Sequence, residues 1–189
     1  ELARQIAINS PRTLILYDQA ETPLYYLELE LLDLAPDLEI VPIVASVTDQ
    51  NALTQVFETY KPQKVYHAAA YKHVPLMEQN PRSAAFTNIL GTYLVGLAAA
   101  RSGVRTFVLV STDKAVRPTS VMGASKRVAE LVLQALAEQS NNTCFTMVRF
   151  GNVLDSSGSV IPLFKQQINA GGPITVTHSK VTRYFMTIP

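Results

Sequence analysis

Tryptophan is absent from the 189 residues, cysteine occurs once, and no glycine precedes Gly91. The single Cys144 excludes an internal disulfide and is typical of a reducing compartment. Basic and acidic side chains nearly balance, 16 against 15, so no excess charge favours nucleic acid or an acidic membrane surface as the partner. The pattern of histidine and cysteine indicates no metal site, and His67, on an apolar run, is expected to be a hydrogen-bonded core residue.

Long runs of apolar residues are also missing. The longest, Thr92–Ala100, falls short of the roughly 18 apolar residues that a membrane helix needs. Glu1 and Arg4 lie in a helical pattern, so we expect no signal peptide at the amino end. The 48% share of apolar residues excludes a disordered chain and suits one compact domain.

What the sequence does have is an alternation of short apolar runs with longer helical patterns. The short runs predict strands at 13–17, 39–44, 64–70, 105–110 and 144–150, with a short extra strand at 174–176. The longer patterns predict helices at 1–8, 22–34, 49–60, 81–102, 120–139 and 160–170. Strands that are apolar on both faces and alternate with helices indicate a parallel sheet covered on both sides.

This alternation predicts an α/β fold with a Rossmann-like, doubly wound parallel sheet. Such a sheet begins with a strand and a glycine-rich turn that places a pyrophosphate at a helix amino end. Neither is recognisable before residue 13, so we expect a fragment whose sheet lacks its central first strand and is open in the middle. We expect 1–150 to form the cofactor-binding portion and 151–189 to begin a substrate-binding portion, each truncated at its outer end.

Polar side chains follow the fourth predicted strand, at the edge where ligands of such sheets bind. Thr112, Asp113 and Lys114 stand directly after it. Met122 and Lys126, four residues apart, share a face of the next helix. An adjacent acid and base suit the elimination of water by proton transfer, and a lysine at this place can reach a ribose hydroxyl. The alternative is an ordinary solvated loop between a strand and a helix.

These residues resemble a known family. In the short-chain dehydrogenase/reductase superfamily a Tyr-x-x-x-Lys helix follows a strand that bears Ser or Thr, and here Met122 stands at the tyrosine position. Together with the stretches 67–81, 111–127, 149–164 and 181–189, the pattern resembles the CapD-like polysaccharide biosynthesis proteins. The resemblance implies a UDP-N-acetylglucosamine 4,6-dehydratase, a lyase of bacterial surface polysaccharide or glycoprotein glycan biosynthesis that yields a UDP-4-keto-6-deoxy sugar and water.

The resemblance also implies residue roles. Lys114 removes the proton at carbon 5, Asp113 protonates the leaving hydroxyl at carbon 6, and Thr112 holds the oxygen at carbon 4. Lys126 binds the nicotinamide ribose, and its charge, with that of the oxidised nicotinamide, favours the neutral form of the neighbouring lysine base. Met122 cannot exchange protons, although the large relatives resemble this chain in carrying methionine there. Asp113, or a water held by Thr112, is left to deprotonate the hydroxyl at carbon 4.

For the cofactor, the resemblance implies tightly bound NAD or NADP that is regenerated in each cycle. Asp18 ends a strand where a carboxylate binds the adenosine ribose, which favours NAD, but it can equally cap the following helix. Ser46 and Val47 stand where the family often has Asp-Val against the adenine, and Ser46 departs from that pattern. A run of small residues lets the dinucleotide lie close to the backbone: Ala68, Ala69 and Ala70.

The substrate contacts implied by the resemblance are more scattered. Asn152 resembles a residue of the family that touches the substrate, and Ser159 lies in a turn near the nucleotide. Lys72 and His73 approach the sugar or the diphosphate, or belong to a solvated loop. Arg183 pairs with a phosphate or forms a salt bridge.

Two other functions stay open. A UDP-sugar 4-epimerase shares the hydride step but needs no elimination, so the Asp113–Lys114 pair disfavours it. A non-catalytic nucleotide-binding remnant is compatible with Met122, Ser46 and the missing glycine-rich turn. We expect the truncated chain to be inactive alone, with the oligomeric state open, a homo-oligomer included. We expect a cytoplasmic location, at the inner membrane only through segments absent from this chain.

Overall fold

A computed structural model describes residues 1–154, 160–176 and 182–187. The strands are β1 (Thr13–Asp18), β2 (Glu39–Val44), β3 (Lys64–His67), β4 (Thr106–Thr112), β5 (Cys144–Phe150), β6 (Asn152–Val153) and β7 (Phe185–Met186). The α-helices are α1 (Leu2–Ile8), α2 (Glu21–Leu34), α3 (Gln50–Tyr60), α4 (Val74–Gln79), α5 (Pro81–Ala84), α6 (Gly91–Arg101), α7 (Val121–Gln139) and α8 (Val160–Asn169). A π-helical segment, η1 (Ala85–Leu90), joins α5 to α6, and a 3-10 turn, η2 (Asp113–Ala115), follows β4.

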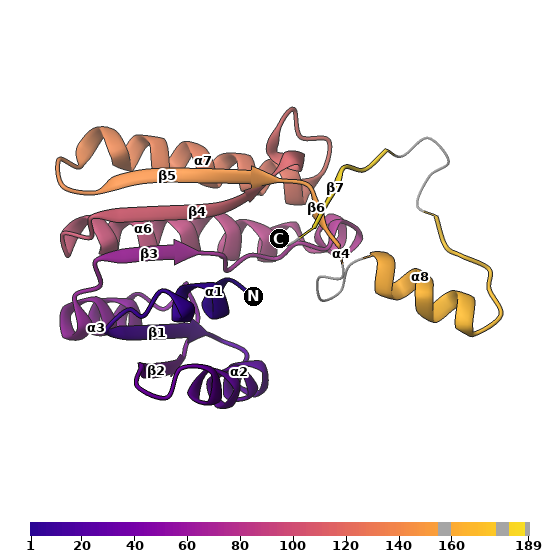
Figure 1. Ribbon diagram of the computed structural model, residues 1–189. Helices are drawn as coiled ribbons and strands as arrows, with labels where there is room; N and C mark the ends of the chain where they lie inside the picture. Colours follow the sequence, from indigo (N-terminus) through magenta and orange to yellow (C-terminus); the bar gives the residue numbers. More distant parts are fainter. Residues whose placement is uncertain (155–159, 177–181, 188–189) are drawn as a thin grey trace.

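The strands form two parallel sheets rather than one. β1 pairs with β2, with Thr13 opposite Glu39, while β3, β4 and β5 pair in that order, with Thr106 opposite both Lys64 and Cys144. Within the described residues no strand pairing joins the two sheets, and Figure 1 shows β1 and β2 below the β3–β4–β5 sheet. The predicted α/β fold with parallel strands, open in the middle, is therefore confirmed.

Helices α3, α6 and α7 form the layer that encloses the main core. In Figure 1, α6 and α7 run behind the β3–β4–β5 sheet. Alternate residues of β4 are buried against this layer, among them Phe107 and Leu109, which are fully buried. A second core lies under α1 and α2, where Leu14 and Leu16 of β1 meet the buried leucines of α2. The buried residues of β4 thus fix the position of its carboxyl end.

The structure departs from the sequence prediction in three places. β3 ends at His67, so the three alanines after it lie in a loop, and the six-residue α4 that follows was not predicted. The helix predicted over 81–102 is interrupted by the π-helical η1. Residues 174–176 form no strand; the small carboxyl-terminal sheet pairs Asn152 with Phe185 instead.

The stretch Pro81–Arg101 is long and apolar enough to cross a membrane, with 21 residues and a mean hydropathy of 1.3 over its most apolar window. Sequence reasoning did not predict this span, because polar residues such as Asn88 interrupt its apolar residues. In the structure α6 packs against both α3 and α7, and Asn88, Thr92 and Ala99 are fully buried. Its hydropathy is accounted for by its central place in the helical layer.

Candidate active site

The carboxyl end of β4 places alternate side chains on opposite faces of the sheet. Ser111 is buried toward α7, whereas Thr112 is half-buried on the other side. The Thr112 hydroxyl accepts from the backbone N–H of Lys114 at 3.3 Å, and this cap starts the 3-10 turn η2. The turn presents Asp113 and Lys114 at the edge of the sheet where ligands of parallel α/β folds bind.

Four residues that the sequence singled out meet at this point. Lys114 Nζ donates to Asp113 Oδ1 at 3.0 Å and to Asn152 Oδ1 at 2.9 Å. The Thr112 hydroxyl donates to the same Asp113 oxygen at 3.0 Å. The Asp113 and Lys114 side chains are about one third exposed, 34% and 35%. An acid and a base are therefore adjacent, half-buried and open to a ligand.

The first turn of α7 packs directly on this turn of chain. Ser120 caps the helix by accepting from Gly123 N–H, and Glu78 of α4 accepts from Val121 N–H at 2.7 Å. A Cβ at position 123 would come within 2.4 Å of the Lys114 carbonyl oxygen, so only glycine permits this approach. The helix thereby fixes the backbone from which the Lys114 side chain extends.

Lys126, one turn further along α7, is a buried cation. Its side chain is 5% exposed, and Nζ donates to the Val110 carbonyl of β4 at 2.8 Å. Burial lowers the pKa of Lys126 to about 8, although the negative charge of Glu130 opposes the shift. The ammonium thus lies just beneath the strand end where Thr112 begins the acid–base group.

Glu130 organises the other side of the strand end, and sequence reasoning missed it. The fully buried carboxylate accepts from Ser111 and Arg149 at 2.7 Å each, with a second Arg149 contact at 2.5 Å, and from Arg127 at 2.9 Å. Burial alone would raise its pKa, but these hydrogen bonds more than offset burial and bring the pKa of Glu130 to about 2. We call these four residues the Glu130 cluster.

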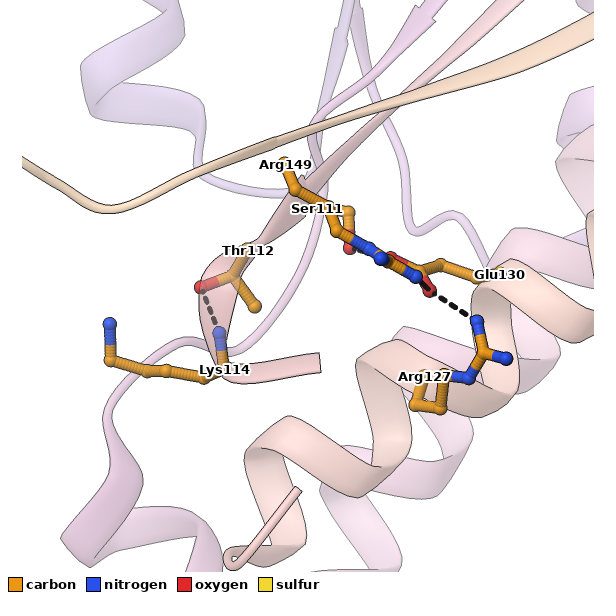
Figure 2. A network of polar contacts seen from close by, with 6 residues as sticks. All are labelled: Ser111, Thr112, Lys114, Arg127, Glu130 and Arg149. Carbon is orange, nitrogen blue, oxygen red and sulfur yellow. Dashed lines mark hydrogen bonds and ion pairs between the residues drawn. The ribbon is translucent and has the colours of Figure 1, made fainter. Parts of the chain in front are cut away.

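Figure 2 shows that the polar side chains at the strand end lie in two separate groups. The Glu130 cluster converges on one side of β4, while the Lys114 side chain points away from it. Because Ser111 lies directly opposite Arg149 in the pairing of β4 with β5, the cluster ties both strand ends to α7. A signal in the sequence existed, since Glu130 follows Lys126 by four residues on the buried face of an amphipathic helix.

Met122, at the position of the superfamily tyrosine, does not lie among these polar groups. It is 4% exposed and packs with Met77 and Ala84, flanked by Val74 and Val121. The side chain therefore joins α4 to the first turn of α7.

His67 is the buried, hydrogen-bonded histidine that the sequence led us to expect. Its Nε2 lies 3.0 Å from the Thr92 hydroxyl, which donates its own proton to the Asn88 carbonyl at 2.7 Å. The histidine therefore donates through Nε2. Burial, together with the charge of Lys126, lowers the pKa of His67 to about 3.

The loop after β3 is held by Asn88, a second residue that sequence reasoning missed. This fully buried side chain in η1 binds both polar groups of the Tyr71 backbone and donates to the Ser125 hydroxyl at 2.9 Å. The π-helical turn is the local feature that sets Asn88 apart, and such turns are frequent at functional sites. The loop places the predicted wall residues Ala68, Ala69 and Ala70 beside the exposed Lys72 and His73.

Asp18 is exposed at the carboxyl end of β1. Its Oδ1 accepts from the Ala20 N–H at 2.8 Å, and Ala20 itself is the N-cap of α2, so Asp18 shapes the turn before the helix rather than capping it. This contact engages one carboxylate oxygen. Asp18 therefore combines a turn-forming role with the position expected of a ribose ligand.

Ser46 and Val47 follow β2 at the same edge. The Ser46 hydroxyl hydrogen-bonds Thr48 at 2.8 Å, and its carbonyl accepts from the Tyr17 hydroxyl at 2.9 Å. Burial, with the charge of Asp49, raises the pKa of Tyr17 to about 12. Val47 packs on Gly91 of α6, where a Cβ would come within 2.7 Å. This turn is a fixed surface next to Asp18.

The remaining predicted substrate residues belong to the carboxyl-terminal part. Asn152 begins β6, and its N–H donates to the Tyr184 carbonyl at 2.8 Å. Arg183 is exposed in the segment before β7. Ser159 lies outside the described residues. Of the substrate set, the structure therefore brings Asn152 to the Lys114 side chain.

The fold and the strand-end residues define an α/β protein of the Rossmann-like class. The family described as polysaccharide biosynthesis protein matches residues 1–189, and the chain belongs to that family. It is 52% identical to the capsular polysaccharide biosynthesis protein CapD of Staphylococcus aureus and 50% identical to EpsC of Bacillus subtilis. Both alignments cover 100% of this chain and 32% of the relative, so the chain spans about a third of their length.

A solved structure is similar over nearly the whole chain. The crystal structure of Pen from Bacillus thuringiensis superposes with a TM-score of 0.87 at 34% identity, covering 97% of this chain and 57% of that one. The Rossmann-like expectation is thereby confirmed.

Proposed function

We propose that this chain is the catalytic core of a UDP-N-acetylglucosamine 4,6-dehydratase, a nucleotide-sugar modifying enzyme. The observation that carries the proposal is Lys114 Nζ held against Asp113 and Asn152, with Thr112 on the same carboxylate. An elimination needs an acid and a base within reach of one sugar ring, and this turn supplies both from adjacent residues.

The residues divide the work as follows. In its neutral form Lys114 takes the proton from carbon 5 of a 4-keto sugar, and Asp113 protonates the hydroxyl that leaves carbon 6 as water. Both of these hydrogen bonds of the Asp113 side chain fall on Oδ1, which leaves Oδ2 to carry that proton. Thr112 holds the oxygen at carbon 4. Asp113, or a water held by Thr112, deprotonates the hydroxyl there.

The donor set fits a nicotinamide dinucleotide, NAD or NADP. The Asp18 carboxylate would hold the adenosine ribose, the turn at Ser46 and Val47 would face the adenine, and the small residues after β3 would let the dinucleotide lie close. The buried Lys126 would hold the second ribose in place of the Val110 carbonyl. A nicotinamide held by these residues would supply the acceptor and the donor for hydride transfer at carbons 4 and 6 of the sugar. The acidic Asp18 favours NAD, because α2, which follows it, contains no lysine or arginine to bind a 2′-phosphate.

The proposed reaction would belong to bacterial polysaccharide biosynthesis. The family and its curated relatives concern polysaccharide biosynthesis, for which a UDP-4-keto-6-deoxy sugar is a precursor, and a bacterial cytoplasmic location supplies the sugar nucleotide. Lys72, His73 and Arg183 would contact the sugar or its diphosphate. A UDP-sugar 4-epimerase is the second candidate, but it gives no role to the Asp113–Lys114 pair.

The test is a mass spectrum of UDP-N-acetylglucosamine incubated with the protein as its gene encodes it. The proposal predicts loss of one water, abolished by Lys114→Ala and retained by Lys64→Ala, which removes an exposed lysine from the opposite end of the sheet. An unchanged mass with inversion at carbon 4, observed by NMR, would identify the epimerase. No change in either measurement would favour a non-catalytic remnant.

A further inference from the structure

Asn152 reaches the end of β4 from a separate part of the chain. It begins β6, which pairs in parallel with β7, and its backbone N–H donates to the Tyr184 carbonyl. A Cβ at the preceding Gly151 would come within 2.6 Å of the same carbonyl, so the backbones here are in close contact. The place of Asn152 is therefore set by the pairing of β6 with β7, independently of the side chain that it binds.

The contact between Asn152 and Lys114 has a geometric consequence. A neutral lysine amine carries two N–H bonds and one lone pair around Nζ, in addition to its bond to Cε. Donation to Asp113 Oδ1 at 3.0 Å and to Asn152 Oδ1 at 2.9 Å uses both N–H bonds. The lone pair then has one direction left. With a single acceptor the amine would rotate, so the two acceptors together orient the base.

We propose that Asn152 is a positioning residue that orients the lone pair of Lys114, an inference that rests on the proposed dehydratase function. In the step concerned, an N–H bond forms at Lys114 Nζ while the C–H bond at carbon 5 breaks, and its electron pair passes into the enolate of the 4-keto sugar. An amide oxygen suits this role because it accepts a hydrogen bond without adding a negative charge. A second carboxylate would favour the ammonium form, which cannot accept a proton.

The charged groups around Lys114 are themselves bound, so the effect of substituting Asn152 can be attributed to position 152. Asp113 stands beside it on η2, and α7, which packs on η2, carries Lys126 and Glu130. The Lys126 ammonium is bound to the Val110 carbonyl, and the Glu130 carboxylate is bound within the Glu130 cluster. In an Asn152→Asp variant, the negative charge at position 152 is therefore the change in the electrostatic environment of Lys114.

The first arm of the test measures the chemical reactivity of Lys114 in the absence of substrate turnover. The protein as its gene encodes it is acetylated with acetic anhydride from neutral to alkaline pH, and the Lys114 peptide is quantified by mass spectrometry. Asn152→Asp, which is isosteric, should move the labelling midpoint of Lys114 upward by about one pH unit. Asn152→Leu should speed Lys114 labelling, because one acceptor is lost. The control Asn141→Leu, in the exposed loop before β5, should change neither.

The second arm reads catalysis. Asn152→Leu should lower kcat on UDP-N-acetylglucosamine by about 10- to 100-fold with little change in KM, because the base is misdirected rather than the substrate released. A rise in KM with unchanged kcat and unchanged Lys114 labelling would overturn the inference and leave Asn152 as a substrate contact.

The two arms separate this inference from the function on which it rests. If the wild type releases water from the sugar nucleotide, but substitutions at Asn152 change neither Lys114 labelling nor kcat, the positioning role is wrong and the dehydratase function stands. If the wild type releases no water, the dehydratase and the positioning role fail together, whatever the labelling shows of the contact.

Discussion

Asn88 binds both polar groups of one peptide unit: its Oδ1 accepts from Tyr71 N–H at 2.8 Å and its Nδ2 donates to the Tyr71 carbonyl at 3.1 Å. The same amide donates to Ser125 on α7. One fully buried side chain therefore holds the loop after β3 against the helix that carries Lys126. The loop that presents Lys72 and His73 has a fixed position relative to the acid–base group.

Replacing this side chain should loosen the loop and destabilise the protein. Asn88→Leu leaves the Tyr71 backbone groups without their partner and removes the donor to the Ser125 hydroxyl, at a cost of about 2 to 3 kcal/mol in the free energy of unfolding. Urea denaturation measures the cost, and hydrogen exchange should show faster exchange at the Tyr71 amide. The exposed Asn142→Leu is the control. A loss below about 0.5 kcal/mol, typical of surface substitutions, would contradict this account.

The Glu130 cluster should make stability depend on acid pH. Hydrogen bonds outweigh burial and bring the folded pKa of Glu130 to about 2, below its ordinary 4.5. The unfolded chain therefore binds the proton first, and the contribution of Glu130, full above about pH 4.5, is lost as the pH falls toward 2. Glu130→Gln should flatten this part of the pH–stability curve and cost about 3 kcal/mol at neutral pH.

The control for Glu130 is Glu138→Gln on the same helix, where the side chain is exposed. Chemical denaturation at a series of pH values compares the three proteins. Parallel curves for the wild type and Glu130→Gln would show that the carboxylate is not held as described.

Lys126 should act in the opposite pH range. Burial lowers its folded pKa to about 8 from 10.5, so burying the ammonium costs stability below pH 8 and the cost fades as the pH rises toward 10.5. Lys126→Met should be more stable than the wild type near neutral pH, and the difference should narrow by about 2 kcal/mol between about pH 7 and about pH 9.5. Urea denaturation at both pH values checks this, with the exposed Lys64→Met as control. A difference that is independent of pH would refute it.

Asp18 should set the choice of dinucleotide. In the proposed site, its exposed carboxylate would accept hydrogen bonds from the ribose hydroxyls and would repel a 2′-phosphate. Asp18→Ala should weaken NAD binding by about tenfold, or about 1.4 kcal/mol, and leave NADP binding unchanged or improved. Calorimetric titration of the protein as its gene encodes it gives both affinities. Equal losses for the two dinucleotides would instead indicate that Asp18 acts through the turn that it makes with Ala20.

The strands and the acid–base turn were predictable because their signals are local. Runs of β-branched residues placed β1, β2 and β5 within a residue of their bounds, and the Thr112–Lys114 stretch was found at a strand end. The missing pairing between β1 and β3 was predictable as well, from the absence of early glycine.

The parts that escaped prediction depend on distant partners. Asn88 is joined to Tyr71 across 17 residues and to Ser125 across 37, and Glu130 is joined to Arg149 across 19. The pairing of β6 with β7 joins two-residue strands that no periodicity reveals. The helix α4 is too short for a helical pattern to stand out, and its anchors, Glu78 on Val121 and Met77 on Met122, lie on another element.

The central claim is that Lys114 takes the proton from carbon 5 and Asp113 delivers one to the hydroxyl of carbon 6. The most direct measurement follows UDP-N-acetylglucosamine in D2O with wild type, Asp113→Asn and Lys114→Ala, using mass spectrometry and NMR. The account predicts dehydrated product with deuterium at carbon 5 for the wild type. It predicts no loss of water for Asp113→Asn, and neither exchange at carbon 5 nor dehydration for Lys114→Ala. Deuterium at carbon 5 in the Lys114→Ala reaction would contradict it, because another group would then be the base.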